Sequence, residues 1–115
     1  MKEQDPVEVR VTCASRSEAE RIGAHLLAGR LAAGVQILGP ITSHYWWRGR
    51  LETAEEWCCW VKTRAGLSRK IVAVIKELHS YEVPEVIVVP IVGGNGEYVQ
   101  WILAETHPEE EGLTR

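Results

Sequence analysis

The residues around Pro84 place the end of a helix directly before a strand that has no polar face. Pro84 lacks a backbone N–H and disfavours helical geometry at Val83, so an amphipathic helix over 67–79 must end before it. Residues 86–89 are all β-branched and apolar. Such a strand suits a position covered on both faces better than one exposed on one face. The sequence therefore predicts a strand at 85–92 and a second layer that covers it.

Other local patterns predict the remaining elements. Residues 7–13 alternate apolar and polar side chains, as a half-buried strand does. Ser17 and Glu20 have the spacing of a capping box at a helix start. Gly39-Pro40 predicts a bulge or bend within a long strand. The predicted elements are a strand at 7–13, a helix at 17–28, a bent strand at 33–47, a hairpin turn at Arg48-Gly49, a strand at 51–63, a helix at 67–79, a strand at 85–92 and a final helix capped by Asn95.

This β-α-β-β-α-β order with an appended helix predicts an α+β fold, a ferredoxin-like sandwich with helices on one face of an antiparallel sheet. In the third strand, Trp57, Cys59 and Val61 point to one face, whereas Cys58 and Trp60 point to the other. Apolar groups then remain on the face that no helix covers. Burying an aromatic side chain contributes roughly 2 to 3 kcal/mol. We therefore expect subunits to associate through their sheets.

Composition limits the classes of function. The chain has 115 residues, of which 45% are hydrophobic, which predicts a single domain over 1–115, with a core at about 7–106 and a flexible tail over 107–115. The net charge is −3 and the basic residues are scattered, so we expect no nucleic-acid partner. The polar N-terminal residues and the lack of a long apolar run predict no membrane partner and a cytoplasmic location.

Catalytic and structural-metal motifs are missing from the sequence. Cys13, Cys58 and Cys59 make an odd set, which favours reduced thiols over disulfides. Neither C-x-x-C nor H-x-x-x-H occurs, so a metal site must be assembled from distant segments. The sequence has no nucleophile elbow, P-loop or metalloprotease helix, and we expect a protein that is not an enzyme. At residues 93–96 we expect a turn rather than a phosphate loop, because the lysine and the spacing of a P-loop are missing.

Ordered blocks of sequence resemble the CutA family of divalent-cation tolerance proteins from about Val7 to Thr106. The blocks are L-A-A-G-V at 31–35, T-S-H-Y-W-W-R-G at 42–49, V-K-T at 61–63, H-S-Y-E-V-P-E at 79–85, P-I-V at 90–92 and G-N-G-E-Y-V-Q-W-I at 94–102. The resemblance implies ferredoxin-like subunits assembled as a homotrimer. It also implies a role in metal tolerance or in the response to metal ions, with Cu²⁺ or another divalent cation as ligand and no cofactor required for folding.

The family's copper site maps onto Cys13 and His79 of this chain. Leu78 and Ser80 depart from the family pattern, since they stand where many members have a histidine and a proline, and Gly34 replaces a second common cysteine. The set carried over from the family is thus incomplete. A thiol and an imidazole are suitable copper or zinc ligands. The alternative is structural, with Cys13 packed beneath the first helix and His79 as a polar helix end.

Four further residues are candidates for a cleft or for additional ligands: His44, Tyr81, Glu82 and Glu85. Tyr81, Glu82 and Glu85 flank the rigid Pro84 turn and are candidates to line a small-molecule pocket. The alternative is that the carboxylates make contacts between subunits. A second class of function therefore stays open, in which a PII-like signalling or adaptor trimer binds a small molecule or a protein in its intersubunit clefts.

Overall fold

The computed structural model describes residues 1–107 of the chain. Its elements are β1 (Pro6–Cys13), α1 (Arg16–Ala28), β2 (Gly34–Trp47), β3 (Arg50–Arg64), a 3₁₀ turn (Ala65–Leu67), α2 (Ser68–Leu78), β4 (Val86–Pro90) and α3 (Gly96–Glu105). Every predicted helix and strand is present, in the predicted order. The tail predicted from residue 107 lies outside the described residues except for His107, which is half-buried.

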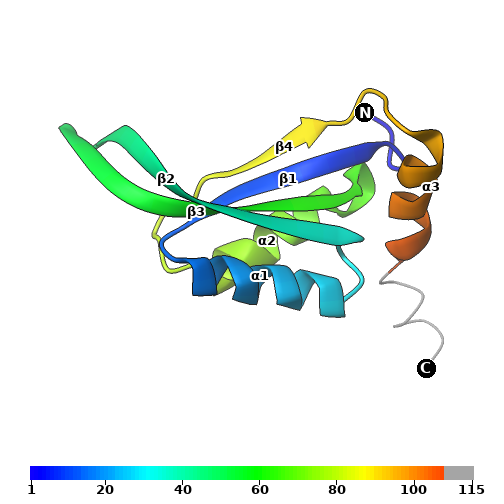
Figure 1. The fold of residues 1–115 in the computed structure, drawn as a ribbon, viewed down its shortest axis with the longest axis horizontal. Coiled ribbons are helices and arrows are strands. Elements are labelled where there is room, and N and C mark those ends of the chain that lie inside the picture. Colours follow the sequence, from blue (N-terminus) through cyan, green and yellow to red (C-terminus); the bar gives the residue numbers. More distant parts are fainter. Residues whose placement is uncertain (108–115) are drawn as a thin grey trace.

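The strands form one antiparallel sheet in the order β2-β3-β1-β4. Helices α1 and α2 lie side by side beneath one face of this sheet, and α3 stands at one end (Figure 1). The predicted α+β arrangement with both helices on one face is therefore confirmed. The edge strand β4 is shorter than the predicted 85–92, although the Ile91 N–H still donates to the Pro6 carbonyl at 3.1 Å.

The core lies between the sheet and the two helices. Alternate residues of the central strands point into it, among them Val9, Val11 and Cys59, which are at most 1% exposed. From α2, Ile71 and Ile75 fill the same layer and are fully buried. The predicted division of β3 is correct, since Cys59 is buried in the core whereas its neighbour Cys58 is only partly buried on the other face.

The face of the sheet that α1 and α2 leave open is more polar than predicted. Glu8 lies at its centre and accepts hydrogen bonds from Arg10 at 2.5 Å and from Lys62 at 2.6 Å. Burial alone raises the pKa of Glu8, but the hydrogen bonds and positive charges of Lys62 and Arg10 hold it below its ordinary value. The Arg10 guanidinium also lies 4.5 Å from the ring centroid of Trp60. Apolar and charged groups thus share this face.

One face of β4 is also uncovered within the single chain. Val86 and Val88 pack against the core, whereas Ile87 is 47% exposed on the open face. The predicted second cover for this strand is therefore not supplied by the helices.

Strands β2 and β3 form a long hairpin that extends well beyond the helical layer (Figure 1). Arg48 and Gly49 make its two-residue turn with φ angles of 52° and 81°, the positive values that such tight hairpin turns require. The register shifts between Leu38 and Ile41, which confirms the bulge predicted at Gly39-Pro40. The hairpin leaves large side chains exposed, including Trp46 at 72%.

The N-cap of helix α1 lies two residues before the predicted one. The hydroxyl of Ser15, rather than Ser17, caps it by accepting a hydrogen bond from the Glu18 backbone N–H at 3.1 Å. This shift places Glu18 in the first turn and directs it inward. Among residues 1–107, no helix combines the length and apolar composition needed to cross a bilayer.

Candidate functional site

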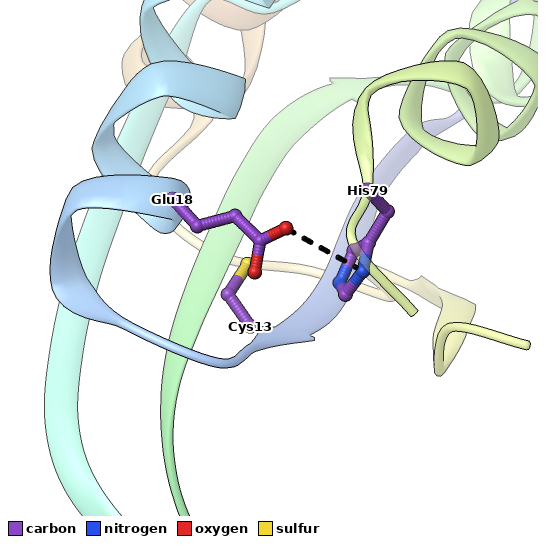
Figure 2. Close-up of side chains that lie close together, drawn as sticks. All are labelled: Cys13, Glu18 and His79. Atoms are coloured by element: carbon purple, nitrogen blue, oxygen red, sulfur yellow. Dashed lines mark ion pairs between the residues drawn. The ribbon is translucent and has the colours of Figure 1, made fainter. Parts of the chain in front are cut away.

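Three buried side chains with metal-binding atoms converge where β1, α1 and α2 meet. Cys13 ends β1, Glu18 lies in the first turn of α1 and His79 follows α2, and Figure 2 shows the three side chains facing one another. Their ligand atoms all lie within 4.8 Å of one another. The structure thus brings together Cys13 and His79, the pair that the sequence proposed, and adds a third residue.

Both ring nitrogens of His79 already have partners. A carbonyl oxygen can only accept, so Nε2–H donates to the Thr12 carbonyl at 2.7 Å. A backbone N–H can only donate, so Nδ1 accepts from Tyr81 at 3.1 Å. These contacts assign the tautomer with the proton on Nε2. The Nδ1 lone pair also faces Glu18 Oε2, 3.7 Å away (Figure 2), and a metal ion would compete with the Tyr81 N–H for it.

Glu18 is a buried carboxylate held by backbone donors. It accepts hydrogen bonds from the N–H of Ala14 at 2.9 Å and of Ser80 at 2.7 Å. Burial alone raises the Glu18 pKa, but these hydrogen bonds from Ala14 and Ser80 hold it below its ordinary value. The cluster therefore contains a full negative charge at neutral pH, which favours a cation.

Cys13 resists ionisation in this setting. Burial, and after it the negative charge of Glu18, raises the pKa of the Cys13 thiol to about 12. The thiol is therefore protonated at neutral pH. A bound divalent cation would reverse this effect, because a coordinated thiol loses its proton to the solvent.

The donor set fits a borderline or soft divalent cation. Thiolate, imidazole and carboxylate ligands bind zinc and copper at about 2.0 to 2.3 Å, which places tetrahedral ligands roughly 3.3 to 3.8 Å apart. The 3.7 Å separation of His79 Nδ1 and Glu18 Oε2 is in this range. Small shifts would bring in the sulfur of Cys13, and three protein ligands leave a position for water.

The sequence-based search missed Glu18. It assigned the capping box to Ser17 and Glu20, whereas Ser15 and Glu18 have the same spacing. The second pair is the one that forms the cap, so the glutamate directed toward the end of β1 is Glu18. The Ser15–Glu18 register, read together with the nearby Cys13, is the sequence signal that points to this third residue of the cluster.

The other candidates gather in a separate cleft between the β2–β3 hairpin and the loop after α2. Its volume is about 730 Å³. All four predicted cleft residues line it, together with residues from β1 and the hairpin. The lining is formed by Thr12, Ser43, His44, Tyr45, Trp47, Glu56, Ser80, Tyr81, Glu82, Val83, Pro84 and Glu85.

Contacts within the cleft tie the loop to the hairpin. The Tyr81 hydroxyl donates to Glu56 Oε2 at 2.7 Å, and Arg48 Nη2 forms an ion pair with Glu82 at 2.8 Å. Burial and the acceptor Glu56 both raise the pKa of Tyr81, which keeps its phenol protonated. His44 is not directed toward the buried cluster, since its Nδ1 is 3.0 Å from the Thr53 hydroxyl. His44, Glu82 and Glu85 therefore do not join Cys13 and His79.

Comparison with known proteins identifies a family model and individual proteins that resemble this chain. Residues 7–105 match the family model described as CutA1 divalent ion tolerance protein. The chain belongs to this family. It is 40% identical over 94 residues to the divalent-cation tolerance protein CutA of Archaeoglobus fulgidus, covering 82% of this chain and 91% of that protein. It is 38% identical over 98 residues to the chloroplastic CutA 1 of Oryza sativa, covering 85% of this chain and 55% of that protein.

Solved CutA structures have the same fold. The structure of the Archaeoglobus fulgidus protein, described as a periplasmic divalent cation tolerance protein, superposes with a TM-score of 0.85 at 37% identity and covers 89% of this chain and 99% of that one. The CutA family resemblance is therefore confirmed. This chain spans little more than half the length of its rice relative, at 55%.

Proposed function

We propose that this chain acts in divalent-cation tolerance by binding a divalent metal ion, with Cu²⁺ the first candidate, at Cys13, Glu18 and His79. The convergence of their ligand atoms within 4.8 Å carries the proposal. Membership of a divalent ion tolerance family supports it. Glu18 takes the place of the histidine that many family members have at the position of Leu78. We propose binding only, and no catalysed reaction.

Binding would exchange internal contacts for metal bonds. The ion takes the Nδ1 lone pair of His79 from the Tyr81 N–H, and Cys13 releases a proton as its sulfur coordinates. Glu18 supplies the charge that balances part of the cation. The Nε2–H bond to Thr12 remains and orients the imidazole, as outer hydrogen bonds do for metal-bound histidines.

The assembled form we propose is a cytoplasmic homotrimer of single-domain, ferredoxin-like subunits. The partly apolar open face of the sheet supports association, because it leaves Ile87 and Trp60 without a covering layer in the single chain. The matched CutA proteins do not favour the alternative of a PII-like signalling or adaptor trimer.

Calorimetric titration of the purified protein with Cu²⁺ tests this site, and Zn²⁺ provides a parallel titration free of thiol oxidation. Each of the substitutions Cys13→Ala, Glu18→Gln and His79→Ala should weaken metal binding by at least about tenfold. The matched controls are Cys58→Ser and His25→Gln, which change a thiol and an imidazole outside the cluster. Unchanged affinity in the three site variants, with circular dichroism equal to that of the parent protein, would refute the site.

A further inference from the structure

We propose that the cleft between the β2–β3 hairpin and the loop after α2 binds a small organic cation, namely an amine or guanidinium compound with an apolar chain. This ligand site is separate from the buried metal cluster. Three features support it: the charge of the lining, a buried carboxylate that lacks a counter-ion, and the way the protein holds one of its own guanidinium groups beside the cleft.

The lining combines carboxylates with aromatic rings. Its charged residues are three glutamates, Glu56, Glu82 and Glu85, and its aromatic side chains include Tyr45, Trp47 and Tyr81. No lysine or arginine of the described residues lines it. Negative charge attracts a cation, and aromatic faces attract it further when it approaches within about 6 Å of the ring centre. An anionic ligand would be repelled.

Glu56 gives the strongest local argument. The residue is only 5% exposed, and among residues 1–107 its carboxylate accepts one hydrogen bond, from the Tyr81 hydroxyl at 2.7 Å. Within residues 1–107, no ion pair involves Glu56 or Glu85. A desolvated carboxylate without a cation is unfavourable, and a positively charged group from outside would relieve that cost.

Arg48 shows how residues of the cleft hold a guanidinium group of the protein. Its guanidinium pairs with the cleft residue Glu82 at 2.8 Å and lies 5.2 Å from the ring centroid of the cleft residue Trp47. A carboxylate and an aromatic ring of the cleft therefore already hold an organic cation. Glu56, Glu85 and the two tyrosines offer the same chemistry without such an occupant.

The geometry favours an organic cation over a metal ion. Among the described residues, only Cys13, Glu18 and His79 bring three ligand atoms together closely enough for one ion, so the cleft carboxylates do not converge. A volume of about 730 Å³ is also far larger than an ion needs, whereas pockets for small organic ligands measure about 300 to 1,000 Å³. A ligand with an alkyl chain between two charged ends would pack its chain against the aromatic side chains and place its charges beside the glutamates.

Titration calorimetry with putrescine (1,4-diaminobutane) on the assembled protein tests the proposal, with 1,4-butanediol as the neutral analogue. Putrescine should bind, the diol should not, and added salt should weaken putrescine binding. Glu56→Gln keeps an acceptor for Tyr81 but removes the charge, and should weaken binding by about tenfold or more. Trp47→Leu should weaken it about threefold.

Neighbouring residues of the same hairpin provide matched controls. Glu55→Gln and Trp46→Leu make the same chemical changes outside the lining and should leave the affinity unchanged. Cys13→Ser should weaken metal binding by at least about tenfold yet leave putrescine binding intact, which separates this proposal from the metal site. Absence of putrescine binding overturns the proposal, as does equal binding of the diol or an unaltered affinity in Glu56→Gln.

Discussion

The imidazole of His79 donates a hydrogen bond to the backbone carbonyl of Thr12 at 2.7 Å. This contact joins the end of α2 to the end of β1, although 67 residues separate the two in sequence. The next residues along the chain are anchored from the same place, because Tyr81 donates its N–H to the same ring. The His79 imidazole therefore helps to hold both the buried cluster and the loop that lines the cleft.

Replacing His79 should destabilise the fold even without metal. His79→Ala leaves the Thr12 carbonyl and the Tyr81 N–H without partners, and we expect a loss of about 1 to 3 kcal/mol in the free energy of unfolding. Urea unfolding at fixed protein concentration measures this change, since stability of an oligomer depends on concentration. Glu77→Ala, which alters an exposed side chain near the end of α2, should stay close to the parent protein. An equal midpoint for both variants would contradict the anchoring role.

Metal affinity should rise with pH. The Cys13 pKa of about 12 means that the thiol is protonated near neutrality, so each bound ion displaces its proton. Between pH 6 and 8 we expect the affinity for Zn²⁺ to increase about tenfold per pH unit through this proton alone. Calorimetry in buffers of different ionisation enthalpy counts the protons released. In Cys13→Ser that release should disappear, and a pH-independent affinity in the parent protein would exclude thiolate coordination.

The carboxylate of Glu18 should govern part of the acid stability. Its folded-state pKa is lowered, so its contribution is present above the ordinary value of 4.5 and is lost as the pH falls through the folded-state pKa. Glu18→Gln should reduce stability at pH 7 by about 1 to 3 kcal/mol, because one backbone donor loses its acceptor. It should also flatten the decline in stability below pH 4.5.

Thermal unfolding from pH 7 to pH 3 checks this dependence. The matched control is Glu20→Gln in the same helix, which changes an exposed carboxylate paired with Arg16. That variant should follow the parent protein closely, since exposed ion pairs contribute little. If Glu18→Gln and the parent protein lost stability in parallel on acidification, the lowered pKa of Glu18 would be contradicted.

The bulge in β2 depends on a close approach between Gly39 and Trp57. A Cβ at Gly39 would lie 2.7 Å from Cδ2 of the Trp57 ring. Gly39→Ala should therefore force the ring or the strand to move and cost about 1 to 3 kcal/mol. Gly93→Ala has nothing within 4 Å and serves as the control. Chemical denaturation that gives the two variants the same midpoint would show that the contact is unimportant.

Local patterns were sufficient to predict the elements, and tertiary contacts account for what they missed. Alternation and helical spacing repeat within a few residues, so the strand ending at Cys13 was predicted, and the helix predicted over 67–79 differs from α2 by one residue at each end. Glu18 was missed because the capping box was assigned to Ser17 and Glu20, and because its contact with Ser80 spans 62 residues of sequence. The polar centre of the open face was also not predicted, because the contact between Glu8 and Lys62 spans 54 residues of sequence.

The open face of the sheet should be an interface, and a charge placed there should weaken assembly. Light scattering of the parent protein should give a mass near three times 12.9 kDa. Ile87 is 47% exposed in the single chain, so Ile87→Lys should leave the subunit folded. In a trimer, however, it would bury an ammonium group next to Arg10, its partner in β1. We expect the free energy of assembly to become less favourable by about 2 kcal/mol or more.

The matched control is Leu27→Lys, which makes a similar change on α1, on the opposite side of the sheet, and should leave the mass unaltered. A parent protein that scatters as a 12.9 kDa particle at micromolar concentration would contradict the trimer, because the open face would then be stable in water.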